Sequence, residues 1–202
     1  MLESSSSWRL FIGISAEAEV LDWVSRLRAE CGIRRGVRWT PAEQMHLTLK
    51  FLGEVETSRV DGIHASLARV SNTYLPFVLE LAGAGAFRGR DGTGVLWLGV
   101  AAHEELFRLA GDLDRALSCH GFASERRPFR PHLTVARWRS GAQDEADRVL
   151  SSAETMRAAR LGWSVRGFTL FRSELGPAGA RYTRIGEFPL GEAPPNGFLT
   201  VG

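Results

Sequence analysis

Two copies of a four-residue pattern contain the side chains best suited to chemistry. The sequence reads HLTL from His46 and HLTV from His132, so a threonine follows each histidine two positions later. Residues two apart on a β-strand project from the same face, which would place each imidazole beside a hydroxyl group. Histidine titrates near neutral pH, so one imidazole can accept a proton while the other donates one. The pair is therefore a candidate general acid and base.

The groups around the two histidines would suit a phosphate ester. The hydroxyls of Thr48 and Thr134 can donate hydrogen bonds to non-bridging phosphate oxygens. Lys50, the only lysine, shares the His46 face by strict alternation and is a candidate electrostatic contributor, and Arg130 is a candidate contact for phosphate or backbone. Arginines, whose planar forks match phosphate oxygens, gather beside both motifs: Arg34, Arg35, Arg38, Arg126, Arg127, Arg130, Arg137 and Arg139.

Other chemistries fit the sequence less well. A lone histidine on a half-buried strand is usually structural, but two matched copies favour a functional role. A metal site needs three or four convergent ligands, and no carboxylate is adjacent to either motif on the histidine face, so we expect no metal. The GxSxG serine motif, the P-loop and the Rossmann glycine pattern are all absent from the sequence.

The composition is that of an ordinary globular protein. The 202 residues are 44% hydrophobic and 24% charged, and the formal net charge of +2 alone does not indicate a nucleic-acid partner. No apolar run approaches the ~20 residues that cross a bilayer, and no signal peptide is recognisable, so we expect no membrane association. Cys31 and Cys119 fall at predicted helix ends, which argues against a disulfide and favours the cytoplasm.

Hydrophobic spacing predicts a mixed α+β chain. The predicted strands are Trp8–Ile14, Val37–Thr40, Gln44–Leu52, Phe77–Ala84, Val95–Val100, Pro131–Trp138, Trp163–Arg172 and Arg181–Phe188. The predicted helices are Glu17–Glu30, Glu56–Val70, Ala102–His120 and Gln143–Arg160, and the glycine-rich segment Gly83–Gly94 is expected to be a connection. Alternation places Phe51 on the apolar side of its strand, while stacking of Phe51 or Trp138 on a base stays open.

The order of the elements nearly repeats in the second part of the chain. We therefore expect one domain over residues 8–190 with two similar lobes, each supplying one histidine strand to a shared cleft. Residues 1–7 are expected to be a flexible N-terminus and residues 191–202 a turn-rich tail. A monomer is expected, because nothing resembles a heptad seam.

The motifs resemble those of the RNA 2′,3′-cyclic phosphodiesterases, also called 2′–5′ RNA ligases, of the 2H phosphoesterase superfamily. The resemblance spans Arg9 to Leu190 and is carried by RLFIGI, RWTPAEQMHLTLKFLGEV, VLWLGV, ERRPFRPHLTVAR, FTLFRSEL and GPAGARYTRIGEFPL. It implies an α+β bilobal fold, with two antiparallel sheets flanked by helices around a central cleft.

The resemblance also implies a reaction and roles for individual residues. His46 would be the proton donor, His132 the proton acceptor, and Thr48, Thr134 and Arg137 would hold phosphate. A terminal 2′,3′-cyclic phosphate of RNA would open to a 2′-phosphate and a free 3′-hydroxyl, without ATP, metal or another cofactor. Some members of the family also join tRNA half-molecules by a reversible 2′–5′ linkage.

Three points remain open from the sequence. The spacing does not separate the roles of the two histidines, which would titrate as a coupled pair. Strict alternation puts Arg137 opposite His132, so its role requires a bulge or a strand end near Ala136. Alternative functions are a 2H phosphodiesterase for another cyclic or 2′–5′-linked nucleotide, and a protein that binds RNA ends without catalysis.

Overall fold

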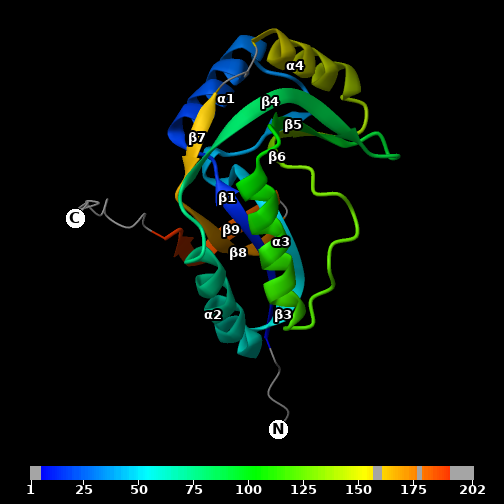
Figure 1. Ribbon diagram of the computed structural model, residues 1–202. Coiled ribbons are helices and arrows are strands. Elements are labelled where there is room, and N and C mark those ends of the chain that lie inside the picture. Colours follow the sequence, from blue (N-terminus) through cyan, green and yellow to red (C-terminus); the bar gives the residue numbers. More distant parts are fainter. Residues whose placement is uncertain (1–5, 157–160, 177–178, 192–202) are drawn as a thin grey trace, which may run out of the picture.

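The computed structural model describes residues 6–156, 161–176 and 179–191 (Figure 1). Its strands are β1 (Ser7–Ser15), β2 (Val37–Trp39), β3 (His46–Glu56), β4 (Phe77–Arg88), β5 (Gly94–Val100), β6 (His132–Trp138), β7 (Gly162–Val165), β8 (Gly167–Gly176) and β9 (Gly179–Pro189). Its helices are α1 (Ala18–Cys31), α2 (Val60–Ser71), α3 (Glu104–Ser118) and α4 (Gln143–Met156), and short 3₁₀ turns precede β3 and α2.

All strand pairs are antiparallel. The strands lie in the order β7-β4-β5-β6-β3-β1-β8-β9, and β2 pairs with β6 beside this row. The α+β class with antiparallel strands and flanking helices is confirmed. The two halves of the sheet meet where β3 pairs with β6, through the single Cα pair Leu47 and Leu133. The two histidine strands are therefore neighbours at the centre of one continuous strand order.

The four helices cover the two halves of the sheet in two pairs, and the members of a pair are not all from the same half of the chain. Helices α2 and α3 pack together against β9 and β3, whereas α1 and α4 pack together against β7 and β4. Figure 1 shows α1 and α4 at one end of the molecule and α2 and α3 at the other. Because α1 follows β1 in sequence but covers the opposite half of the sheet, each lobe combines early and late segments of the chain.

Helix α3 shows how the hydrophobic pattern becomes a core. Its four leucines Leu106, Leu109, Leu113 and Leu117 follow one helical face, as the sequence predicts, and all have an exposed fraction of 0%. Full burial of a leucine side chain contributes roughly 1.5–3 kcal/mol relative to leaving it in water. This stripe holds α3 against β3, which supplies His46.

The predicted connection at Gly83–Gly94 is mostly strand. β4 continues to Arg88 and pairs with β5 as far as Gly94, so the turn is confined to the residues between them. Gly83 has a φ of +71° and lies at a register shift, where the strand takes up extra residues without ending. The glycines therefore mark a bulge as well as a hairpin turn.

The predicted strand Trp163–Arg172 is two strands. Residues before Arg166 form β7, which pairs with β4, and residues after it form β8, which pairs with β1. The backbone carbonyl of Arg166 instead accepts a hydrogen bond from Leu190. The chain thus crosses between the two ends of the sheet within one apolar run, and hydrophobic alternation carries no sign of that crossing.

Several predictions for the ends of the chain and of its elements fall on residues that the structure does not describe. β1 begins at Ser7, one residue before the predicted domain start, while residues 1–5, 157–160 and 192–202 lie outside the described residues. The domain limits therefore stay a prediction. Both cysteines are free and occupy helix ends, as predicted. Of the helices described, none is both long and apolar enough to span a bilayer.

Candidate active site

The histidine-threonine pairs of the two motifs surround the contact between β3 and β6. Because Leu47 and Leu133 are antiparallel partners, the ladder sets His46 opposite Thr134 and Thr48 opposite His132. All four side chains line one cavity of about 600 Å³. Two imidazoles that line one cavity can act on a single phosphorus centre held between them.

The cavity is positively charged. Besides the two histidines it is lined by Arg9, Arg38 and Arg137, and no aspartate or glutamate among the described residues lines it. Arg38 on β2 and Arg137 on β6 are direct Cα partners. Like charges in opposite positions of a ladder repel each other, and an anion between them relieves the repulsion. The arrangement therefore favours a phosphate-bearing ligand.

Each histidine is oriented by the same backbone contact. Nδ1 of His46 lies 2.7 Å from the carbonyl oxygen of Gln44, and Nδ1 of His132 lies 2.7 Å from that of Arg130. A carbonyl oxygen can only accept, so both Nδ1 atoms carry the proton and donate it. Nε2 of each ring is consequently the nitrogen left to take up or release a proton. The repeat of this contact gives the pair a local two-fold symmetry.

His46 lies in an aromatic surrounding. Its ring centroid is 4.7 Å from that of Phe11, 5.2 Å from that of Tyr182 and 5.8 Å from that of Phe171. Burial lowers the pKa of His46 below the ordinary value of 6.5, against the backbone hydrogen bond to Gln44, and the charges of Arg137 and His132 lower it further.

His132 meets a different set of neighbours. The edge of its ring contacts Phe87 at a centroid distance of 5.1 Å, and the ring of Trp97 lies 6.3 Å away. On the partner strand the position opposite His132 is Gly99. The two imidazoles thus share their backbone contact but have distinct aromatic walls.

A bulge in β6 brings Arg137 to the cavity. The ladder pairs Leu96 with Ala136 and Trp97 with Thr134, which leaves Val135 as an extra residue. Val135 and Ala136 are both buried, after which Arg137 is exposed on the face of His132. The bulge that the role of Arg137 requires is therefore present.

A bulge of the same kind in β3 reverses the predicted positions of Lys50 and Phe51. Phe11 pairs with Phe51 and Gly13 with Thr48 across a register shift, so alternation changes phase after Thr48. Lys50 is buried with 8% of its surface exposed, whereas Phe51 is 68% exposed and lines the cavity. The prediction that Lys50 shares the His46 face, with Phe51 on the apolar side, is wrong for this reason.

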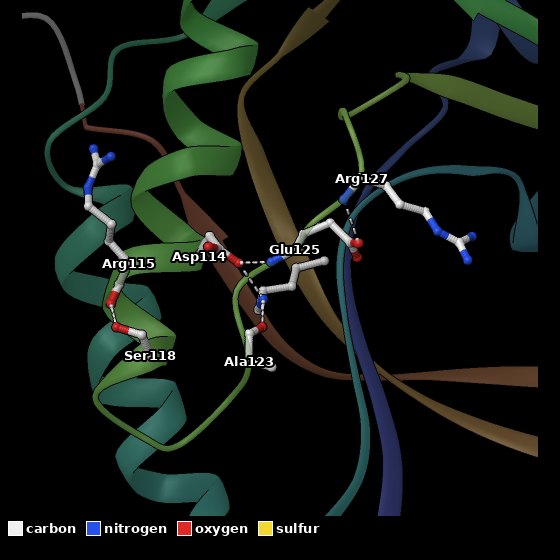
Figure 2. A network of polar contacts seen from close by, with 7 residues as sticks. Asp114, Arg115, Ser118, Ala123, Glu125 and Arg127 are labelled. Atoms are coloured by element: carbon white, nitrogen blue, oxygen red, sulfur yellow. Dashed lines mark hydrogen bonds and ion pairs between the residues drawn. The ribbon is translucent and has the colours of Figure 1, made fainter.

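Lys50 joins β3 to α3 and to the segment that follows α3. Its ammonium group donates to the carboxylate of Asp114 and to the carbonyl of Ala123, and the same carboxylate accepts from the backbone N–H of Glu125 (Figure 2). Burial alone would raise the pKa of Asp114, but the hydrogen bonds from Lys50 and Glu125 bring it below its ordinary value. Lys50 therefore contributes to the structure around the site.

The remaining predicted residues have different positions. Arg130 is exposed beside His132 and its carbonyl orients that ring. Trp138 is buried in the core and its indole N–H donates to the carbonyl of Gly92, so it does not face the cavity. Sequence reasoning did not single out Arg9 or Tyr182, although both line the cavity. Both residues lie in segments that carry the family resemblance, Arg9 in RLFIGI and Tyr182 in GPAGARYTRIGEFPL, and this was the available signal.

The described residues contain no group of three or more histidine, cysteine, aspartate or glutamate side chains placed to hold a metal ion. His64, His103 and His120 lie outside the cavity. The site consequently consists of two imidazoles, hydroxyl groups and guanidinium groups on an aromatic frame.

A family model described as the 2′-5′ RNA ligase superfamily matches residues 16–177. A Geobacillus stearothermophilus protein named RNA 2′,3′-cyclic phosphodiesterase is 34% identical over 91% of this chain, which spans 58% of that protein. A protein of the same name from Archaeoglobus fulgidus is 33% identical over 89% of this chain and 99% of its own length.

The fold agrees with a solved structure of the same group. The crystal structure of Escherichia coli LigT complexed with 3′-AMP is 29% identical in sequence and superposes with a TM-score of 0.72. The match covers 92% of this chain and 99% of the LigT chain.

Proposed function

The chain belongs to the 2′-5′ RNA ligase superfamily, and on that premise we propose that it hydrolyses terminal 2′,3′-cyclic phosphates of RNA. The product is a 2′-phosphate with a free 3′-hydroxyl. Curated relatives carry the name RNA 2′,3′-cyclic phosphodiesterase, and a related structure binds 3′-AMP. The proposal applies that substrate class to this chain.

The observation that carries the proposal is the symmetric orientation of the two imidazoles. Both rings donate Nδ1–H to a backbone carbonyl, which reserves Nε2 of His46 and Nε2 of His132 for proton transfer. In the proposed reaction, Nε2 of His132 takes a proton from water as the water oxygen attacks phosphorus. Nε2–H of His46 gives a proton to the departing 3′-oxygen. Such paired proton transfer contributes typically ~10²–10⁴-fold.

The negative charge of the substrate supports the role of His46 as proton donor. In the free protein the lowered pKa of His46 favours its neutral form. A bound phosphate anion favours the imidazolium, so substrate binding would load the proton that His46 donates. The hydroxyls of Thr48 and Thr134 and the guanidinium of Arg137 would bind the non-bridging oxygens and stabilise the pentacoordinate phosphorus.

The same geometry supports ring opening by a second nucleophile. A 5′-hydroxyl of RNA in place of water would give a 2′–5′ phosphodiester, with His132 taking the hydroxyl proton. Ligation of this kind uses no group beyond those of hydrolysis. The proposed partners are accordingly RNA ends or nucleotides that bear a 2′,3′-cyclic phosphate.

The direct test is phosphorus NMR of an oligonucleotide with a 2′,3′-cyclic phosphate end, incubated with the protein in excess EDTA. We expect the cyclic phosphate signal to be replaced by that of a 2′-phosphomonoester. His46→Ala and His132→Ala should each abolish conversion, while His64→Ala, at a histidine outside the cavity, should not. Conversion that survives loss of either site histidine, or that stops with EDTA, contradicts the mechanism.

Two other outcomes separate the alternative functions. Turnover of a mononucleotide or a 2′–5′ dinucleotide, with the RNA end untouched, would indicate a 2H enzyme for a different substrate. Tight binding of the RNA end without product, unchanged in both histidine variants, would indicate a binding protein.

A further inference from the structure

A second cavity, of about 920 Å³, opens beside the first on the His132 side. The two cavities share Thr48, Phe51, Phe87 and His132, whereas His46 lines only the first. A molecule in the second cavity thus lies next to one imidazole of the pair. The proposed hydrolysis of a single nucleotide assigns no role to this space.

The second cavity extends from His132 over α3. Phe107 of α3 is 42% exposed and meets Phe129 edge to face, with ring centroids 5.7 Å apart. Phe51 and Phe87 are also exposed and form the wall shared with the first cavity. Exposed aromatic faces of this kind stack on the bases of single-stranded RNA, and they cost free energy when left in water.

The charges along this cavity leave arginine available for phosphate. The cavity is lined by Arg127 and Arg130, both exposed, and by the acids Asp114 and Glu125. Asp114 is neutralised by Lys50, and the carboxylate of Glu125 accepts the backbone N–H of Arg127. In Figure 2 the guanidinium of Arg127 points away from both acids.

The walls of the second cavity are held in place before any ligand binds. Lys50, Asp114 and Ala123 tie the segment after α3 to β3, and the backbone of Glu125 donates to Asp114 (Figure 2). A cavity ordered in advance loses less entropy on binding than one that must form around its ligand. This network is the structural role of the buried lysine.

We propose that the second cavity binds a 5′-hydroxyl end of RNA as the acceptor of a phosphoryl transfer. The inference rests on the proposed function, because it takes His132 as the group that deprotonates the nucleophile. The 5′-oxygen attacks phosphorus, the 5′-O–P bond forms and the P–O3′ bond breaks. The hydroxyl proton goes to Nε2 of His132 and the proton of His46 Nε2 goes to the 3′-oxygen.

The position of the cavity distinguishes an acceptor from the donor strand. The first cavity contains both histidines, Thr134 and Arg137, and so accommodates the cyclic phosphate and its nucleoside. A nucleoside attached to the attacking oxygen must instead extend outward past His132. The second cavity occupies that direction and provides aromatic and cationic contacts for the first acceptor nucleotides.

The experiment measures how the protein divides one donor between water and RNA. Adenosine 2′,3′-cyclic phosphate is the donor, and a trinucleotide with a free 5′-hydroxyl and a blocked 3′ end is the acceptor. We expect hydrolysis to 2′-AMP without acceptor, and a 2′–5′-linked tetranucleotide whose rate of formation saturates as acceptor is added.

Paired variants locate the acceptor site. Phe107→Ala and Arg127→Ala should each lower the rate of transfer about tenfold, the effect of losing one stacking or phosphate contact, with hydrolysis of the mononucleotide unchanged. Leu75→Ala and Arg126→Ala, at an exposed apolar residue and at the arginine beside Arg127, are the matched controls, since neither residue lines either cavity.

Results other than the expected ones distinguish a wrong acceptor site from a wrong proposed function. Hydrolysis without any 2′–5′ product, or transfer that Phe107→Ala and Arg127→Ala leave intact, overturns the acceptor site but not the proposed function. Variants that slow hydrolysis of an oligonucleotide donor while transfer from the mononucleotide persists would assign the cavity to the donor strand, which also overturns the inference. Absence of hydrolysis by the wild-type protein would contradict the proposed function itself.

Discussion

Leu47 and Leu133 form the one Cα pair that joins β3 to β6, and a histidine precedes each of them. Since the strands are antiparallel, this pairing relates the motifs by a local two-fold axis. Each strand then contains a bulge after its threonine, and each histidine donates Nδ1–H to the carbonyl two residues earlier. The symmetry of the site is therefore a property of backbone pairing.

The charge of Arg137 should be measurable at His46. Burial is the main cause of the lowered pKa of His46, and Arg137 lowers it further. Arg137→Gln removes a positive charge and should raise the pKa of His46, since the imidazolium is then repelled less. An NMR titration of the His46 ring protons measures this change, and Arg139→Gln, outside the cavity, is the control. A pKa that stays the same or falls contradicts the geometry.

The same variant should reduce catalysis. A hydrogen bond to a charged group contributes about 1.5–3 kcal/mol, so Arg137→Gln should lower kcat/KM for a cyclic-phosphate end roughly 10- to 100-fold. Steady-state kinetics of the purified variant checks the effect. An equal loss in Arg139→Gln would show that general positive charge, and not contact with phosphate, is what matters.

Gly13 provides a steric test of the position of His46. A Cβ atom at Gly13 would lie 2.9 Å from the carbonyl oxygen of Leu47 and 3.2 Å from Cδ2 of His46. Gly13→Ala should therefore displace the ring and lower kcat by at least about tenfold, the penalty expected when reacting groups lose alignment. At Gly176 the nearest atom to an added Cβ is 3.6 Å away, so Gly176→Ala is the control. Full activity of Gly13→Ala would mean that the ring has room to adjust.

The ion pair of Lys50 and Asp114 should matter for stability. Removing one partner of a buried pair costs about 3–5 kcal/mol, and partial exposure of the Asp114 side chain (24%) reduces this to roughly 2 kcal/mol for Lys50→Met. For a chain of this length that corresponds to a Tm lower by about 4–8 °C. Arg108→Met breaks an exposed ion pair and should change Tm little.

The stability lost in Lys50→Met should depend on pH, because Asp114 is the titrating partner of Lys50. Its folded pKa is below the ordinary value of 3.8, so its stabilisation is present above that value and is lost as pH falls through the folded pKa. The difference in Tm between the wild-type protein and Lys50→Met should thus persist at neutral pH and narrow in acid. A difference that grows in acid contradicts the assignment.

That His46 and His132 line one cavity was predictable, because each histidine has a threonine at the same offset on an alternating strand. Alternation failed at Lys50 and Phe51, since Leu49 is the extra residue of a bulge and both neighbouring residues change face. Nothing in the residue types announces that bulge. In β6 the need for a bulge or a strand end follows from the phosphate-binding role that the family resemblance implies for Arg137, because strict alternation puts that side chain on the face opposite His132.

Fold class was predictable from the spacing of leucines in α3 and of apolar residues in the strands. The crossing at Arg166 was not, because Trp163–Arg172 remains apolar on both sides of it. Likewise the partner of α1 is decided by long-range packing with α4 and β7, which helical periodicity does not encode. Local pattern determined the elements, and tertiary contacts determined their neighbours.

The pairing of early helices with late helices and strands has a consequence for engineering the protein. A polypeptide that stops in the β4–β5 hairpin would retain α1 without β7 and α4, and α2 without α3 and β9. Each fragment would expose the apolar faces that its missing complement covers, so neither should be obtainable alone in a native form. Co-production of both pieces from one cell should instead reconstitute the enzyme as a split reporter whose activity depends on their reunion.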